Sequence, residues 1–356
     1  MSVTVLAVWA CMSAERVAFT EVHMGVEARI VVCTDDPARA AEAARRAFDT
    51  IHAWDLALSD WNPQSDAMRL PETAGQRAPV HGRLGRAMEV SAAWHRRTGG
   101  AFDPALGPLV RLWREADRLD AWPPTHAIET ACLRSGWHAV DFRQEQREVT
   151  MRRDGVRLDF GGIGQGLAAD EALEVLHASG FPMAMVDISG DMAIGTAPPG
   201  EPGWRIAVEP AHGDQPVETL LLANCGVSCS GDRGQPRRIG QRQVSHIVDP
   251  STGMPVPLPR QAVVVASDAT RADALATAMC VLPIERCTGL IADDAAHAAR
   301  ITRAEADGGL VSLGTWTGLR RSPQVRADAR SGPVAEPPAR APTEAGSTDP
   351  TSPAPR

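Results

Sequence analysis

The stretch Asp159–Asp170 reads DFGGIGQGLAAD and joins the end of a predicted strand to a glycine-rich turn and the start of a helix. Glycines let the backbone approach a ligand closely, and free N–H groups at a helix N-terminus favour an anion such as phosphate. Peptide carbonyls in such a turn can also face a metal. The stretch predicts a ligand-binding connection between a strand and a helix, and a tight turn that binds nothing is the alternative.

The same turn fits the dinucleotide-binding fingerprint GxGxxG only in part. Gly162 and Gly164 occupy the first two glycine positions, but the third position falls on Leu167. Asp187 lies about as far downstream as a ribose-binding acid is expected. The predicted strands that follow do not alternate with helices, so a Rossmann-type sheet is the weaker interpretation.

The residues on either side of this stretch predict a chain of mixed α and β structure. The Asp154-Gly155 pair tolerates positive φ, so a hairpin is predicted over 149–160. Hydrophobic periodicity and end signals predict helices over 37–58, 83–97 and 269–281, and another from the glycine turn to about 178. Strands are predicted at 26–33, 183–189, 203–209, 218–229, 242–248 and 261–267. Their spacing is typical of antiparallel sheet.

Composition narrows the functional classes. The chain has 356 residues, of which 44% are hydrophobic, enough for one large domain or two intimate lobes. Its net charge is -8 and it has no basic tract, so no nucleic-acid partner is expected. It contains no lysine and no tyrosine, which excludes a Schiff-base lysine, a P-loop lysine and a tyrosine acid.

The two ends of the chain differ from its centre. Residues 3–11 (VTVLAVWAC) are apolar but too short to span a bilayer, and they lack the positive n-region of a secretory signal. Cys11 follows small and apolar residues, loosely like a bacterial lipoprotein cleavage site, so residues 1–19 are interpreted as a signal or lipoprotein remnant, with a first β-strand as the alternative. Residues 322–356 are rich in Pro and Ala and contain no aromatic residue, so a disordered tail is expected there.

Three further stretches carry groups suited to phosphate chemistry. Asp273 and Thr277 lie four residues apart on a predicted helix, so they share a face, and a carboxylate with a hydroxyl suits Mg²⁺. His246, in SHIVDPSTG, stands where a general base could take a proton from a hydroxyl. Phe102 and Asp103, in TGGAFDP, could present backbone and an acceptor to a ligand. The alternatives are a solvated helix face, a loop histidine and a structured loop.

Taken together and in this order, the motifs resemble the ApbE family of FAD:protein FMN transferases. They are Met24-Gly25, Ser59-Asp60-Trp61 with Ser65, TGGAFDP at 98–104, DFGGIGQGLAAD at 159–170, SHIVDPSTG at 245–253 and ADALAT at 272–277. The resemblance covers about residues 20–318. It implies an α+β fold with two intimately joined lobes of antiparallel sheet and flanking helices, and FAD in the cleft between them. The family domain is expected over 20–321.

The resemblance also implies roles for individual residues. Mg²⁺ would be held by the side chains of Asp273 and Thr277 and by the carbonyl of Gly162, with His246 and Asp273 as the catalytic residues. His246 would activate the acceptor hydroxyl. The flavin site would comprise Met24, Trp61, Ala101, Phe102, Asp103, Asp159, Gln165 and the backbone near Ile247.

Two positions depart from the family pattern. Gln165 stands where the family commonly has lysine, so it can hydrogen-bond the flavin or phosphate but supplies no charge. Trp61 stands where tyrosine is frequent and offers a larger stacking face.

The implied reaction is Mg²⁺-dependent transfer of FMN from FAD to a threonine hydroxyl, with release of AMP. The acceptor would be a flavin-carrying subunit of a membrane redox complex, with a Ser/Asp-Gly-Ala/Ser-Thr type sequence around the threonine. The implied location is the periplasm or the outer face of the cytoplasmic membrane, reached through a signal and held by an N-terminal lipid anchor; a complete N-terminus would instead indicate the cytoplasm. An FAD pyrophosphatase and a non-catalytic flavin-binding accessory protein of a respiratory complex are the alternatives.

Overall fold

The structure, a computed structural model, describes residues 15–70, 75–209, 217–231, 237–258, 260–292, 298–302 and 310–321. These residues belong to one compact unit. Of the expected signal remnant, residues 1–14 lie outside the described residues, and residues 15–19 begin the first strand. The expected tail over 322–356 lies outside them. No helix in the described part of the chain is long and apolar enough to cross a bilayer.

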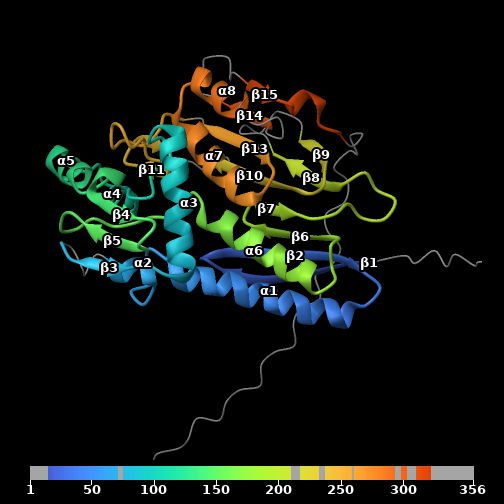
Figure 1. The fold of residues 1–356 in the computed structure, drawn as a ribbon. Helices are drawn as coiled ribbons and strands as arrows, with labels where there is room; N and C mark the ends of the chain where they lie inside the picture. The colour runs from blue at the N-terminus through green and yellow to red at the C-terminus, as the bar shows by residue number, and fades with distance from the viewer. Residues whose placement is uncertain are drawn as a thin grey trace, which may run out of the picture. The chain divides into compact units, whose positions relative to one another are not determined.

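An eight-stranded antiparallel sheet forms the centre of the fold (Figure 1). In spatial order its strands are β1 (Glu15–His23), β2 (Val26–Thr34), β6 (Ala184–Ile188), β7 (Asp191–Ile194), β10 (Cys225–Gly231), β13 (Gln261–Ala266), β14 (Ala298–Thr302) and β15 (Leu310–Gly314). Every neighbouring pair is antiparallel. The α+β class is confirmed.

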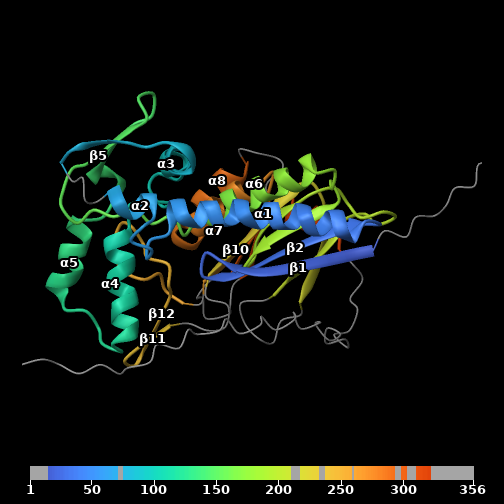
Figure 2. The same ribbon diagram turned by 90° about the horizontal axis from the view of Figure 1, so that it is seen from below.

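Three helices cover one face of this sheet: α1 (Pro37–Leu58), α6 (Gly164–Ala178) and α7 (Ala269–Val281). Figure 2 shows α1 running alongside β1 and β2. Helix α6 contacts both α1 and α7, and α7 also packs on β10 and β13. Helix α1 starts where the sequence predicts, because Asp36 accepts the Arg39 N–H and proline occupies the first turn.

The opposite face of the sheet packs on a short pair of strands, β8 (Trp204–Val208) and β9 (Glu218–Leu222). Strand β13 is buried along its whole length, with Val264 in the core under the helices and Val263 and Val265 in the core under β8 and β9. Burial on both faces explains why this strand is continuously apolar and does not alternate.

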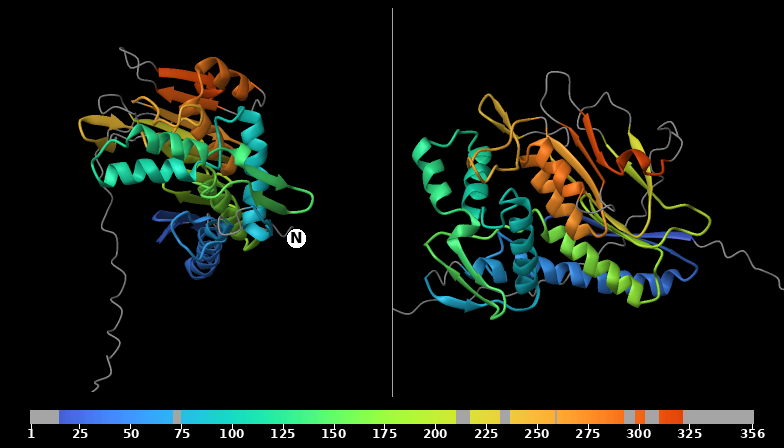
Figure 3. Two further views of the ribbon diagram at one scale, coloured as in Figure 1. Left: turned by 90° about the vertical axis from the view of Figure 1, so that its left-hand side faces the viewer. Right: turned by 45° about the horizontal axis from the view of Figure 1, so that its top comes forward.

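A group of smaller elements lies beside the large sheet (Figure 3). They are β3 (Arg77–Pro79), β4 (Val140–Arg143) and β5 (Glu148–Met151) in one sheet, β11 (Arg237–Ile239) and β12 (Arg242–Val244) in another, and the helices α2 (Asp66–Arg69), α3 (Gly82–Thr98), α4 (Gly107–Arg118) and α5 (Thr125–Leu133). A separate core around Leu109 and Trp113 joins α4 and α5 to β11 and β12. Helix α8 (Ile284–Ala292) follows α7.

The helices predicted over 37–58, 83–97 and 269–281 are confirmed as α1, α3 and α7. The hairpin predicted over 149–160 is wrong. Strand β5 pairs instead with the preceding β4, through a turn in which Arg147 has φ 52. Residues 156–160 are extended and bury alternate side chains, but they bond to a loop: the Asp159 N–H donates to the Pro104 carbonyl.

Candidate active site

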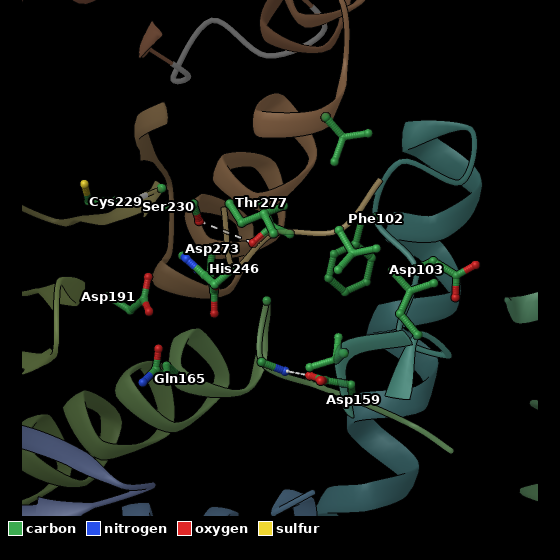
Figure 4. A pocket seen from close by; sticks show the side chains of 18 of the residues that line it. Phe102, Asp103, Asp159, Gln165, Asp191, Cys229, Ser230, His246, Asp273 and Thr277 are labelled. Carbon is green, nitrogen blue, oxygen red and sulfur yellow. Dashed lines mark hydrogen bonds between the residues drawn. The ribbon is translucent and has the colours of Figure 1, made fainter. Parts of the chain in front are cut away.

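A cavity of about 510 Å³ opens between α6, α7 and β10 and the loops that follow α3 and β12 (Figure 4). Ten of the residues predicted for the site line it: Ala101, Phe102, Asp103, Asp159, Gly162, Gln165, His246, Ile247, Asp273 and Thr277. They come from four separate parts of the chain, so the fold brings together motifs that the sequence only places in order.

The two remaining predicted residues, Met24 and Trp61, line an adjoining cavity of about 300 Å³. The two cavities share Arg114, Asp159, Gly161 and Gln165 among their lining residues. Trp61 is 63% exposed, which is unusual for a tryptophan. Met24 has a positive φ of 53°, and its N–H donates to Asp55 Oδ2 at 3.2 Å. All predicted site residues therefore line these two adjoining cavities, which together are called the hollow.

The three predicted metal ligands converge where the glycine turn meets α7. A Cβ atom on Gly162 would lie 2.8 Å from Thr277 Oγ1, so only glycine fits against that hydroxyl. Asp273 Oδ2 accepts the Gly166 N–H at 3.1 Å. Thr277 Oγ1 lies 3.3 Å from Ser230 Oγ. The glycine turn thus lies directly against the face of α7 that carries Asp273 and Thr277.

Asp273 is a buried carboxylate in an acidic surrounding. Asp273 is only 2% exposed. This burial, and after it the negative charge of Asp191, raises the pKa of Asp273 well above the ordinary value. Asp191 begins β7, is itself buried and lines the same cavity. Two neighbouring buried carboxylates repel each other unless a cation or a proton intervenes.

The donor set fits Mg²⁺. It consists of carboxylate, hydroxyl and peptide oxygens, the hard ligands that Mg²⁺ prefers, and the ion commonly takes one or two carboxylates and leaves its other positions to water and phosphate. Among the described residues no group of three or more His, Cys, Asp or Glu side chains is arranged to hold a metal. A thiolate or imidazole cage of the zinc type is not formed by these residues.

Asp159 and Arg114 form an ion-paired group at the border of the two cavities. Arg114, from α4, binds the carboxylate of Asp60 and lies 4.0 Å from Asp159 Oδ2. Asp159 Oδ1 accepts the Gly161 N–H at 2.8 Å, which shapes the glycine turn. Burial and the charge of Asp60 raise the Asp159 pKa, and the Arg114 charge opposes that shift.

His246 and Ile247 lie on the segment that follows β12. His246 is exposed at the cavity wall, and its charge acts on Asp159. The Ile247 N–H donates to Ser245 Oγ at 3.0 Å, and its carbonyl accepts the Val256 N–H at 2.9 Å. A ligand can therefore reach this backbone only through the second lone pair of the Ile247 carbonyl.

Asp103 lines the cavity, but its carboxylate is occupied by hydrogen bonds to backbone N–H groups of neighbouring loops. Oδ1 accepts the Ala105 N–H at 2.8 Å and Oδ2 accepts the Trp137 N–H at 2.9 Å. In Figure 4 its side chain points away from the other labelled groups. Ala101 and Phe102 line the cavity from the same loop.

Sequence reasoning missed several lining residues, among them Asp191 and Arg114. Asp191 follows Ser189-Gly190 at a tight turn between β6 and β7, and a small-Gly-Asp stretch after a predicted strand was the available signal. Arg114 carried no signal, because α4 was not predicted and an arginine on a helix is ordinarily solvated.

Comparison with known proteins connects this geometry to a family. The sequence profile described as "ApbE family" matches residues 24–301. The FAD:protein FMN transferase of Treponema pallidum is 29% identical over 289 residues, 76% of this chain and 80% of that protein. The protein of the same name from Klebsiella pneumoniae is 27% identical over 312 residues, 85% of this chain and 86% of the relative.

Solved structures agree in fold. The ApbE protein of Thermotoga maritima superposes with a TM-score of 0.77 at 25% identity and covers 86% of this chain and all of that one. The flavinyl transferase ApbE of Pseudomonas stutzeri, in its apo form, superposes with a TM-score of 0.73 at 26% identity, covering 86% and 97% of the two chains. The match therefore spans both the large sheet and the smaller elements beside it.

Proposed function

The chain belongs to the ApbE family and is a transferase, and from that premise we propose that it transfers FMN from FAD to a threonine hydroxyl of an acceptor protein, with Mg²⁺ required and AMP released. The observation that carries the proposal is the meeting of Gly162, Asp273 and Thr277 in a cavity that adjoins the one that Trp61 lines. In this proposal the pyrophosphate of FAD lies at the first group and its flavin lies against Trp61.

In this proposal, different residues of the chain bind different parts of FAD. Trp61 offers an exposed aromatic face on which an isoalloxazine ring can stack. Asp273, Thr277 and the Gly162 carbonyl would hold Mg²⁺, which when bound neutralises charge on the pyrophosphate and on the leaving AMP. Gln165, in the first turn of α6, faces both cavities and can donate an amide N–H to a phosphate or to the flavin.

His246 is the proposed general base. It is exposed at the cavity wall, where an incoming protein hydroxyl can reach it. The threonine oxygen bonds to the phosphorus on the FMN side, the bond from that phosphorus to the bridging oxygen breaks, and AMP leaves with the electron pair. The hydroxyl proton passes to His246. FMN then remains on the acceptor as a phosphoester.

The acceptor and the location form part of the proposal. A flavin-carrying subunit of a membrane redox complex, with a Ser/Asp-Gly-Ala/Ser-Thr type sequence, is the proposed acceptor. The periplasm or the outer face of the cytoplasmic membrane is the proposed location, with an N-terminal lipid anchor. Cell fractionation with antibody detection tests the location, and recovery only in the cytosol would contradict it.

The test of the transfer uses purified protein, FAD, Mg²⁺ and a fragment carrying the acceptor sequence. Flavin fluorescence that stays with the fragment through denaturing electrophoresis, together with AMP release, is the expected result. It should disappear with a chelator and with Asp273→Asn. His246→Asn should slow transfer by about 10²-fold or more while FAD still binds, because the proton acceptor is removed without altering the cavity wall.

A matched control is Asp154→Asn, which removes an exposed carboxylate from a turn outside both cavities. It should transfer flavin at the wild-type rate. Release of AMP and free FMN with an unlabelled fragment would favour hydrolysis. FAD binding with no turnover under any condition would favour a flavin-binding accessory protein.

A further inference from the structure

The feature that the proposed function leaves unused is Arg114. It projects from α4 and lines both cavities, and of the lining residues only Asp159, Gly161 and Gln165 share that position. Its guanidinium binds Asp60 and lies 4.0 Å from Asp159. Its own side chain is 46% exposed, whereas that of Asp159 is only 12% exposed, so Arg114 keeps donors for a further partner.

The charges along the hollow explain why such a cation matters. Six carboxylates line the two cavities: Asp55, Asp60, Asp103, Asp159, Asp191 and Asp273. The described arginines that line them are Arg114 and Arg237, and Arg237 borders the larger cavity only. A substrate that carries a pyrophosphate meets a predominantly negative wall. A bound divalent metal would offset the charge around Asp273, whereas at the border with the second cavity the described cation is Arg114.

The position of Arg114 indicates which part of a bound flavin nucleotide its guanidinium would contact. The proposed metal ligands line the larger cavity alone, and Trp61 lines the smaller one alone. A flavin nucleotide laid between them crosses the border with its ribityl chain and the phosphate attached to it. A guanidinium is suited to a phosphate, which it binds through two parallel N–H donors.

We infer that Arg114 binds the FMN-side phosphate of the flavin substrate, with Asp60 and Asp159 holding the guanidinium in place, and that it thereby discriminates phosphorylated flavins from riboflavin. The inference rests on the proposed function.

The test measures the binding of riboflavin, FMN and FAD to the full-length protein by flavin fluorescence titration. Arg114→Gln should weaken FMN and FAD binding by about tenfold or more, because a charge-assisted hydrogen bond is lost, and leave riboflavin binding within about twofold. Arg114→Lys should weaken both phosphorylated flavins less, since the charge stays but the paired donors go. Arg111→Gln, one turn earlier on the exposed side of α4, should change none of the three.

The outcomes separate the inference from the proposed function. Equal weakening of all three flavins, or no weakening of any, would overturn the role given to Arg114. Wild-type protein that binds no FAD would instead contradict the proposed function. A thermal melt of each variant shows whether it is folded, and if Arg114→Gln is unfolded, Arg114→Lys decides: FMN and FAD binding equal to wild type overturns the inference.

Discussion

The carboxylate of Asp170 holds Thr270 twice, accepting its backbone N–H at 2.9 Å and its hydroxyl at 2.6 Å. It also accepts the Ala269 N–H at 2.9 Å. The last residue of the glycine-rich motif therefore fixes the first turn of α7, the helix that carries Asp273 and Thr277. The two motifs of the proposed metal site are joined by this contact.

Loss of the Asp170 carboxylate should loosen both the fold and the site. We expect Asp170→Ala to lower the free energy of unfolding by about 1–3 kcal/mol, because buried N–H groups lose their partner. Urea unfolding measures the loss, and FAD titration measures the effect on the site. Asp36→Ala removes a comparable helix cap from α1, far along the chain from the site, and should cost about 1 kcal/mol without weakening FAD binding. Equal FAD affinity in the two variants would contradict the link.

Asp170 should also make stability depend on pH. Burial raises its pKa from 3.8 to about 6. Folded protein then binds a proton on Asp170 that the unfolded chain has lost, in the window between these two values. The contribution of Asp170 to stability is therefore fully present below about pH 3.8 and is lost as the pH rises through about 6. Urea unfolding of wild type and Asp170→Asn should diverge across this window by on the order of 2 kcal/mol. A difference that does not vary with pH would show that folded Asp170 is ionised throughout.

Asp273 should lower the stability of the metal-free protein while providing a ligand for Mg²⁺. Its pKa is raised by burial and by Asp191, so the ionised form of this carboxylate is disfavoured in the metal-free protein. We expect Asp273→Asn to melt at the same or a higher temperature than metal-free wild type and to lose the rise in melting temperature that Mg²⁺ produces in wild type. Differential scanning fluorimetry with and without Mg²⁺ measures both effects. An unchanged response to Mg²⁺ would remove Asp273 from the metal site.

Trp61 should matter for flavin and hardly at all for folding. It is 63% exposed, so Trp61→Ala should change the free energy of unfolding by less than about 0.5 kcal/mol. Loss of a stacking partner should weaken FAD binding by about three- to tenfold, and Trp61→Phe should restore much of it. Leu133→Ala removes another exposed apolar side chain, 65% exposed and outside both cavities, and serves as the control. Equal FAD affinity in Trp61→Ala and wild type would show that the flavin lies elsewhere.

The sequence predicted the elements that carry periodic or end signals. Helix α1 has a capping aspartate, a proline in its first turn and a spaced apolar face, and it spans the expected residues. The hairpin at 149–160 was wrong because Asp154-Gly155 is only a local signal. Which strand pairs with β5 depends on packing against residues distant in the sequence. The alternation of apolar and polar residues within one segment carries no information about that packing.

The candidate site shows the same contrast between features that local sequence signals predict and features that depend on tertiary packing. Residues within long motifs, such as Gly162 and Thr277, could be assigned to one site from the resemblance, and the structure places them together. Arg114 reaches the cavities only because α4 packs beside the glycine turn, and its ion pair with Asp60 joins residues 54 positions apart. The charge balance of the hollow depends on such tertiary contacts and could not be predicted from one sequence.

The contact between Gly166 and Asp273 has a consequence for how the protein is made. The two residues are 107 positions apart, and the cavity has no complete wall until α7 has docked against α6. A chain emerging from the ribosome must therefore be synthesised through α7, more than three quarters of its length, before the site can form. A growing chain should therefore bind flavin only after α7 has been synthesised, and shorter polypeptides should bind none.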